Sequence, residues 1–300
     1  MNLLFVTDIH GNVNVLRKLA ELDEDVDVLL LGGDITPKMF VSIINYGNMI
    51  MVKGAEGVKI NTEGEAVAYK EFMLRKGYVA WYGTAEEFYE LDKREYTFNV
   101  QKRFLRYAIE TLEKRFKKIF FILGNDDDER LGMESFEHAK NINEKVFYDD
   151  ESGMEFVGFS YVPITPFHSS FELHESEIKI KLESMLDLIT DIKNSIWLFH
   201  SPPYNSGLDL CIELDKQLKP VIKKNTPSFV NVGSKAIRYV IEEHKPKLFL
   251  CGHIHESAGI RYLNSTPCVN PGSESYSDLL RLAFITLDNM KIRKIQIWKI

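Results

Sequence analysis

The chain opens with Asn2-Leu3-Leu4-Phe5-Val6-Thr7-Asp8-Ile9-His10-Gly11-Asn12, in which an apolar run ends in an acid, a histidine and a glycine. Such a run predicts a buried strand followed by a turn. Asp8 and His10 stand two residues apart, so both side chains fall on the same side of an extended backbone. A carboxylate interrupts the run early and no basic segment precedes it, so we expect no signal peptide here.

Four more short apolar runs have the same character and cover residues 26–31, 118–123, 195–199 and 247–251. Elsewhere apolar residues return at three- and four-residue steps, which is typical of amphipathic helices. These helical stretches cover residues 12–22, 98–116, 175–193 and 235–243. Strands that alternate with helices predict a layered α/β core, in which ligand sites form where loops leave the carboxyl ends of the strands.

Two regions depart from this alternation. Residues 260–263, 281–287 and 291–298 alternate like antiparallel strands, with a turn expected at Asp288-Asn289. Residues 39–97 are too long for a simple connection, so we expect a folded insertion there. Within it, helical patterns cover residues 65–74 and 85–91, and the aromatic residues Tyr46, Trp81, Tyr82 and Phe88 are expected to build its own core in preference to lining a substrate pocket.

The composition sets limits on function. The 300 residues are 45% hydrophobic and 27% charged, as in ordinary soluble globular proteins. With 37 basic and 44 acidic residues the net charge is −7, which argues against a broad basic surface for nucleic acid or anionic membranes. The three cysteines form no C-x-x-C pair, so a reducing compartment, the cytoplasm, is expected. No apolar run approaches the roughly 18 residues of a membrane span.

Each predicted strand end carries side chains that could bind a metal. Asp8 and His10 follow the first strand, and the others stand in Gly32-Gly33-Asp34, Gly124-Asn125-Asp126-Asp127, His200-Ser201-Pro202-Pro203 and Gly252-His253-Ile254-His255. Singly, an aspartate could cap a helix and an asparagine could form a turn. Together, imidazole and carboxylate without thiolate suit Mn, Fe, Zn, Co or Ni.

The ordered series D-x-H, G-G-D, G-N-x-D, H-x-P-P and G-H-x-H resembles the calcineurin-like metallophosphoesterases, over nearly the whole chain. The resemblance implies an α/β sandwich of two mixed β-sheets flanked by helices. It also implies one domain over residues 1–300, with the insertion at 39–97 as a cap or helical excursion. The activity implied is that of a dinuclear metal-dependent phosphoesterase, in which a hydroxide that bridges the metals attacks phosphorus in line with the leaving oxygen.

The resemblance also implies a ligand set for two divalent ions about 3.5–4 Å apart. The first ion would be held by Asp8, His10, Asp34 and His255, and the second by Asp34, Asn125, His200 and His253. Asp34 would then bridge the two ions, and Asn125 and His200 would also count as catalytic residues. Mn²⁺ is the first expectation for the metal, with Fe, Zn, Co or Ni as alternatives.

One residue departs from the family. Where many members carry a histidine after the metal-binding asparagine, this chain has Asp126. An ionised aspartate has no proton to donate and would repel a doubly charged monoester. We therefore predict that Asp126 is a catalytic residue of a site that prefers phosphodiesters, or substrates whose leaving group needs little protonation. The alternative is that burial raises the pKa of Asp126 and lets it act as an acid. Residues 127–129 are expected to form a solvated acidic loop, although Asp127 stands where the family places an acid that supports its histidine.

The sequence leaves several alternatives open. The expected partner is a small phosphate ester; a nuclease, with the lysine-rich residues 216–224 as its groove, is not favoured, and a scaffold for protein–protein interaction is the rival from another class. Asn12 could cap a helix or reach a substrate phosphate. Asn270-Pro271-Gly272 is expected to shape the chain beside the site. The remaining histidines are assigned ordinary surface or packing roles: His138, His168, His174 and His244.

Overall fold

Two six-stranded sheets form the centre of the molecule, in a computed structural model that describes residues 1–55 and 57–300. Glu56, which falls inside the insertion predicted at 39–97, lies outside the described residues. The first sheet has the order β21 (Lys291–Lys299), β20 (Arg281–Asp288), β1 (Asn2–Val6), β2 (Val28–Gly32), β6 (Ile119–Ile122) and β7 (Ala139–Asn141). The second has the order β18 (Gly259–Leu263), β19 (Thr266–Asn270), β17 (Leu248–Leu250), β12 (Ser195–Phe199), β9 (Met154–Phe159) and β8 (Lys145–Asp149).

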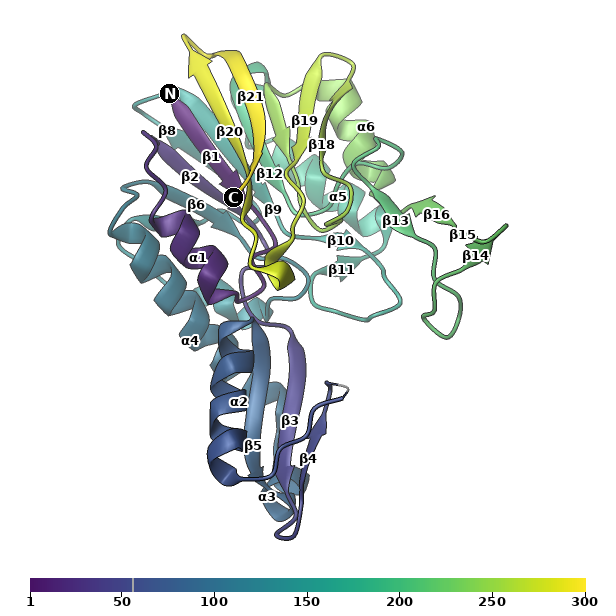
Figure 1. Ribbon diagram of the computed structural model, residues 1–300. Coiled ribbons are helices and arrows are strands. Elements are labelled where there is room, and N and C mark those ends of the chain that lie inside the picture. The colour runs from purple at the N-terminus through teal and green to yellow at the C-terminus, as the bar shows by residue number, and fades with distance from the viewer. Residues whose placement is uncertain (56) are drawn as a thin grey trace.

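The alternation of side chains along β1 explains how the layers pack. Leu3 and Phe5 enter the core between the two sheets, whereas Leu4 and Val6 enter a second core under the helices. That second core is covered by α1 (Val13–Ala20) and α4 (Lys93–Glu113). On the outer face of the second sheet a third core lies under α5 (Glu175–Leu186) and α6 (Lys235–His244). The predicted sandwich of two mixed sheets flanked by helices is confirmed (Figure 1).

Strands β1, β2 and β6 run parallel, as do β9, β12 and β17. Their carboxyl ends therefore meet at one edge of the two sheets. The C-terminal strands are antiparallel as expected, but the turn between β20 and β21 falls one residue later than predicted, with positive φ at Asn289 and Met290. The helix predicted over 175–193 ends at Leu186, because the carboxylate of Glu155 binds the backbone N–H groups of Thr190 and Asp191 and turns the chain away.

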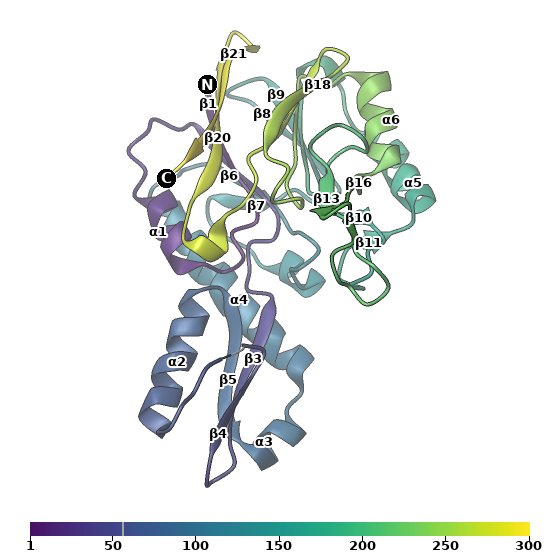
Figure 2. The same ribbon diagram turned by 45° about the vertical axis from the view of Figure 1, so that its right-hand side comes forward.

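The insertion forms a unit of its own, which projects away from the two large sheets in both views (Figures 1 and 2). A three-stranded sheet of β4 (Ile50–Lys53), β3 (Met39–Asn45) and β5 (Tyr78–Thr84) packs against α2 (Glu63–Arg75) and α3 (Ala85–Glu90). The sequence predicted the two helices but not the strands. Lys76 forms an ion pair with Asp278, next to the short 3-10 helix η3 (Ser275–Ser277), and so links the insertion to the main body.

The remaining elements lie in loops beside the carboxyl edge of the sheets. They are β10 (Val162–Pro163) with β11 (Glu172–Leu173), β13 (Leu210–Ile212) with β16 (Phe229–Asn231), β14 (Ile222–Lys223) with β15 (Thr226–Pro227), and the 3-10 helix η1 (Glu129–Met133). The 3-10 helix η2 (Ile192–Asn194) lies at the opposite edge, directly before β12. Among the described residues, no helix is long and apolar enough to cross a membrane.

Candidate metal centre

All of the predicted ligands lie on loops that leave the carboxyl ends of five neighbouring strands. Each stands within a few residues of the end of β1, β2, β6, β12 or β17: Asp8, His10, Asp34, Asn125, His200, His253 and His255. The first five are buried, and the last two are half-buried. The structure thus brings together every residue that the sequence proposed as a ligand.

One group of potential ligands consists of Asp8, His10 and His255. The Nε2 atoms of His10 and His255 are 3.0 Å apart, and Asp8 Oδ1 lies 3.3 Å from His255 Nε2 and 3.9 Å from His10 Nε2. The other oxygen of Asp8 accepts hydrogen bonds from the Thr7 hydroxyl and the His253 backbone N–H, at 2.7 and 3.1 Å. These bonds hold the carboxylate with Oδ1 facing the two imidazoles.

A second group consists of Asp34, His200 and His253. His200 Nε2 lies 3.5 Å from Asp34 Oδ2 and 3.2 Å from Asn125 Oδ1. Its other ring nitrogen donates to the Gly32 carbonyl at 2.8 Å, so Nε2 is the nitrogen directed toward the site. The side-chain amide of Asn125 donates to Ser169 Oγ at 2.9 Å, which leaves Oδ1 facing inward.

Asp34 stands between the two groups. Its Oδ2 lies 3.9 Å from His10 Nε2 in the first group and 3.5 Å from His200 Nε2 in the second. Its Oδ1 accepts a hydrogen bond from the Asp126 backbone N–H at 2.8 Å. This placement is the one that a bridging ligand requires.

Four of the candidate ligands have a left-handed backbone conformation. Asp8, His10, Asp34 and His253 all adopt positive φ, at 56°, 47°, 49° and 66°. Such conformations cost energy in residues other than glycine and cluster at functional sites. Gly33, with φ of 96°, also avoids a clash, because a Cβ there would lie 2.7 Å from His200 Nδ1.

The geometry fits a bound cation. Two imidazole nitrogens 3.0 Å apart require a shared proton or a cation between them. Within the part of the chain that the structure describes, Asp8 Oδ1 and His10 Nδ1 are buried without a hydrogen-bond partner. Buried polar atoms rarely remain unsatisfied, so these atoms point to a ligand that binds at this position. Oxygen and imidazole donors without thiolate suit the divalent ions proposed from the sequence.

The electrostatics keep two of the four candidate histidines, His10 and His253, ready to bind metal, whereas the pKa values of His200 and His255 are raised. Burial, reinforced by the charge of Lys38, lowers the pKa of His10 to about 3. Burial and the charge of His200 lower the pKa of His253 to about 4. Burial alone would lower the pKa of His200, but the Asp34 carboxylate outweighs it and raises that pKa to about 10. At neutral pH His10 and His253 are therefore neutral, whereas His200 carries a proton that a metal would displace.

Asp126, which replaces the family's histidine, is not an uncompensated charge. Lys38 Nζ donates to its carboxylate at 2.7 Å, and His10 Nδ1 lies 3.9 Å from the same oxygen. Burial alone would lower the pKa of Lys38, but the charges of Asp126 and Asp34 outweigh it and raise that pKa. Lys38 was not predicted, because nothing in Thr36-Pro37-Lys38 indicates a partner 88 residues away. Asp126 was expected to repel anions, but Lys38 balances its charge, so the two side chains together carry no net charge.

A buried glutamine holds this pair in place. Gln101, on α4, donates from Nε2 to the carbonyl oxygens of both Pro37 and Asp126, each at 2.8 Å. Its Oε1 accepts from the Asp128 backbone N–H at 3.0 Å. The loops that carry Lys38 and Asp126 are therefore fixed to one side chain.

The expectation of a solvated acidic loop was wrong for Asp127. Its side chain is fully buried and accepts hydrogen bonds from the backbone N–H groups of Ile35, Thr36 and Gly124, at 2.9 to 3.2 Å, and from the Thr36 hydroxyl at 2.6 Å. It thereby joins the loop that follows β2 to the loop that follows β6. Asp128, in the same stretch, forms an ion pair with Arg130 at 2.8 Å.

Two large cavities meet at the site. One, of about 960 Å³, extends toward the insertion, and the other, of about 670 Å³, extends toward β13 and β16. Both are lined by Lys38, Asn125 and Asp126. The second is largely apolar and includes Ile164 and Phe167 in its wall.

The other sequence expectations have mixed outcomes. Asn12 caps α1 by accepting from the backbone of Asn14 and Val15, and its amide donates to Asp278, so the capping role is confirmed. Asn270 donates to the Ile254 carbonyl at 2.9 Å and so holds the loop between His253 and His255, as expected for a residue that shapes the chain beside the site. His168, for which a surface or packing role was expected, lines the larger cavity. Phe88 also lines it, whereas Trp81 is buried against Phe88 and Tyr82 packs in the insertion core.

Comparisons with known proteins agree with this geometry. The family model described as calcineurin-like phosphoesterase matches residues 1–257. An uncharacterised protein of Methanocaldococcus jannaschii, MJ1162, is 33% identical over 176 residues, which are 56% of this chain and 72% of that protein. One solved structure superposes with a TM-score of 0.57 at 15% identity over 99% of this chain and 98% of its own. The crystal structure of TT1561 from Thermus thermophilus superposes with a TM-score of 0.53 at 15% identity, over 99% and 97%, and shares the fold.

Removal of ligands should lower the metal content in a graded way. Asp34→Asn should lose both ions, because Asp34 faces both groups, whereas His253→Ala should lose about one of two. The measurement is elemental analysis after dialysis against Mn²⁺. His138→Ala, outside the site, is the matched control and should keep the wild-type content; full metal content in Asp34→Asn would refute the shared position.

Metal binding should release protons. At pH 8 the metal-free site holds a proton on His200, whose pKa of about 10 lies above that pH, and a metal must displace it. Calorimetric titration with Mn²⁺ in two buffers of different ionisation enthalpy should show a release of about one proton or more per chain. An apparent enthalpy that does not change with the buffer would contradict this assignment.

Proposed function

Because the chain belongs to the calcineurin-like phosphoesterase family, its activity class is metal-dependent hydrolysis of phosphate esters, and we propose that its substrates are phosphodiesters. The residues that would hold two divalent ions are those of the candidate metal centre, with Asp34 shared between them. When bound, such ions polarise a phosphoryl oxygen and lower the pKa of water.

The observation that carries the preference for diesters is the pairing of Lys38 with Asp126. In family members with a histidine at the Asp126 position, that side chain can supply a proton and a positive charge. Here the carboxylate cancels the Lys38 charge, so the pair adds no net positive charge to the site. A monoester dianion needs more positive charge than a singly charged diester does, so the diester is the better electrostatic match.

The shape of the site supports the same proposal. A monoester has one substituent on phosphorus, whereas a diester has two. Two cavities share Lys38, Asn125 and Asp126, and they extend from there in different directions, one toward the insertion and one toward β13 and β16. A phosphate held beside the candidate ligands would have room for one ester arm in each cavity.

The chain's own residues would position the phosphate rather than attack it. His200 is oriented by the Gly32 carbonyl, and Asn125 by Ser169. Gln101 fixes the loops of Lys38 and Asp126 through main-chain oxygens. The arrangement is pre-organised, which reduces the reorganisation that the reaction requires.

Hydrolysis of chromogenic esters tests the class and the preference together. Metal-stripped protein supplied with Mn²⁺ should cleave bis(4-nitrophenyl) phosphate with a higher kcat/KM than 4-nitrophenyl phosphate. His253→Ala should lose more than about 100-fold in this activity, and His138→Ala should lose none. A preference for the monoester would discard the diester proposal. No turnover despite two bound ions would favour the rival scaffold function.

The role of Asp126 can be tested by removing its charge. Asp126→Asn leaves the Lys38 ammonium without its partner, so the ratio of monoester to diester kcat/KM should rise, roughly tenfold for about 1.4 kcal/mol of new attraction. Asp126→Glu keeps the carboxylate and is the matched control, with a ratio near that of the wild type. If Asp126→Asn leaves the ratio unchanged, the Lys38 and Asp126 pair does not set the preference.

A further inference from the structure

The smaller of the two cavities, of about 670 Å³, opens directly onto the candidate metal centre. Its wall includes candidate ligands from the ends of three strands: Asp34, Asn125, His253 and His255. The larger cavity is lined by one of these four, Asn125. An ester arm in the smaller cavity would therefore join a phosphate held at the ligands without a gap to cross.

Apolar side chains from three segments build much of the remaining wall. The loop between β10 and β11 supplies Ile164 and Phe167, the paired strands β13 and β16 supply Ile212 and Val230, and β3 begins with Met39. The pair β10 and β11 lies beside β13 and β16 in both views (Figures 1 and 2). Ile164, Phe167 and Met39 are 48%, 62% and 45% exposed, so apolar surface gathers here in contact with solvent. Apolar patches in a concave setting are typical of ligand sites, and we call this space the apolar cavity.

Several polar groups of the apolar cavity are already engaged within the protein. The Thr165 hydroxyl donates to Glu172, and Glu213 accepts a hydrogen bond from Lys223 at 2.7 Å. Burial raises the pKa of the Cys211 thiol to about 11, so this thiol is uncharged at neutral pH. A sugar or a base placed here would lose hydrogen bonds to water and gain few in return, whereas an alkyl or aryl group would lose none.

The charges of this wall disfavour an anionic arm. Lys38 is the one lysine or arginine among the described residues that line the apolar cavity, and its ammonium is paired with Asp126 at 2.7 Å. Glu213 and Glu256 supply further carboxylates. Coulomb repulsion therefore acts against a second phosphate or a carboxylate on this arm, and it leaves an uncharged arm unaffected.

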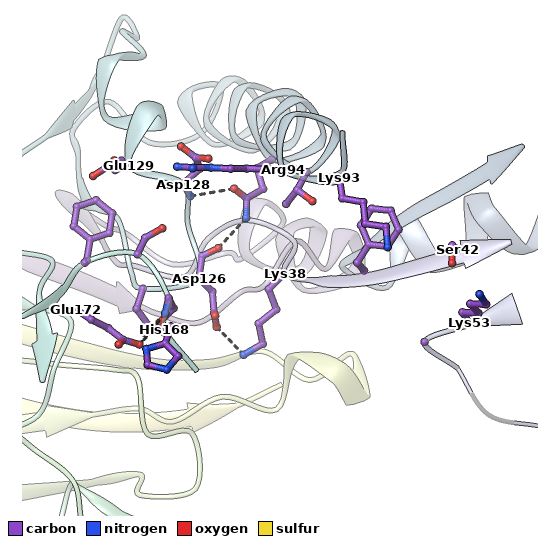
Figure 3. A pocket seen from close by; sticks show the side chains of 18 of the residues that line it. Lys38, Ser42, Lys53, Lys93, Arg94, Asp126, Asp128, Glu129, His168 and Glu172 are labelled. Carbon is purple, nitrogen blue, oxygen red and sulfur yellow. Dashed lines mark hydrogen bonds and ion pairs between the residues drawn. The ribbon is translucent and has the colours of Figure 1, made fainter. Parts of the chain in front are cut away.

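The larger cavity has a different chemistry. Figure 3 shows Lys93, Arg94 and Glu129 along it, and it shows Lys38 directed at Asp126, two residues that line both cavities. A diester with one polar and one apolar arm would match the two cavities. Exchange of the two arms would place hydrocarbon among charged side chains, so the match has a direction.

We propose that the natural substrate is a dissolved phosphodiester of which one ester arm is an uncharged alkyl or aryl group, and that this arm lies in the apolar cavity against Ile164, Phe167 and Val230. The inference rests on the proposed function, since it describes one arm of the diester that the candidate metal centre would hold.

The kinetic test uses two diesters whose chains have the same length but differ in polarity. They are 4-nitrophenyl heptyl phosphate and 4-nitrophenyl 2-(2-methoxyethoxy)ethyl phosphate, which carry the same charge and release nitrophenolate from the same bond. The wild type should show a kcat/KM about tenfold higher for the heptyl ester, because burial of each methylene favours binding roughly fourfold and ether oxygens resist burial. Equal values of kcat/KM would overturn the proposal.

A pair of variants tests where the arm lies. Ile164→Ser/Phe167→Ser makes the wall of the apolar cavity polar, and neither side chain belongs to a buried core. The ratio of kcat/KM for the heptyl ester to that for the ether should fall below about threefold. The matched control Ile180→Ser/Phe72→Ser removes the same side-chain types from α5 and α2, outside both cavities, and should keep the wild-type ratio. A wild-type ratio in the first variant, or an equal loss in the control, would contradict this placement.

A lipid bilayer is another source of alkyl chains. The net charge of −7 and the carboxylates of the cavity argue against an anionic membrane surface. The protein should stay in the supernatant when vesicles of phosphatidylcholine and phosphatidylglycerol are sedimented, and dissolved heptyl ester should be hydrolysed without vesicles. Sedimentation with the vesicles, together with turnover of vesicle-bound ester alone, would overturn the assignment to a dissolved substrate.

A binding experiment separates this inference from the proposed function. Metal-free protein should bind heptyl methyl phosphate about tenfold more tightly than methyl 2-(2-methoxyethoxy)ethyl phosphate by calorimetry, with a more negative heat-capacity change, which is the signature of apolar burial. Ile164→Ser/Phe167→Ser should reduce both differences. This readout does not depend on turnover, so equal affinities in the wild type would refute the apolar arm and leave the hydrolase proposal intact.

Discussion

The carboxylate of Asp34 is the constraint on which the rest of the site depends. It is almost fully buried, with one oxygen held by the Asp126 backbone and the other shared between imidazoles of the two ligand groups. A buried carboxylate is stable only where positive charge or donors surround it. The histidines that surround Asp34 come from the ends of β1, β12 and β17, so the packing of one sheet on the other is what assembles the site.

The strands and the ligands could be predicted from the sequence because both are local signals. An apolar run that ends in polar residues predicts a buried strand, as for β1. A two-residue step in an extended chain places Asp8 and His10 on the same side. The order of the five motifs along the chain then indicated which residues act as ligands. The strands of the insertion were not predicted, because they are buried by packing against α2 and against each other. Strand β9 was also not predicted, because no ligand motif stands at its end, although all of its residues are buried.

The contacts of Lys38, Asp126 and Asp127 could not be predicted, because they join residues that are far apart in the sequence. Lys38 meets Asp126 across 88 positions, and Asp127 binds backbone 91 and 92 positions away. In sequence, Asp126 and Asp127 are two adjacent acids in an acidic stretch. In the fold, one is half of an ion pair at a cavity wall and the other is a buried acceptor that ties two loops together.

Gln101 binds the two loops that carry Lys38 and Asp126, and this affects how the ion pair responds to salt. Mobile ions screen exposed charges within about 10 Å at 0.1 M, but they screen partly buried pairs much less. Lys38 and Asp126 are 29% and 20% exposed, and their loops are anchored at the carbonyls of Pro37 and Asp126, so the ion pair persists as ionic strength rises. The balance of charge beside the candidate metal centre is therefore expected to change little with the ionic composition of the surroundings, whereas exposed charges elsewhere on the surface are screened.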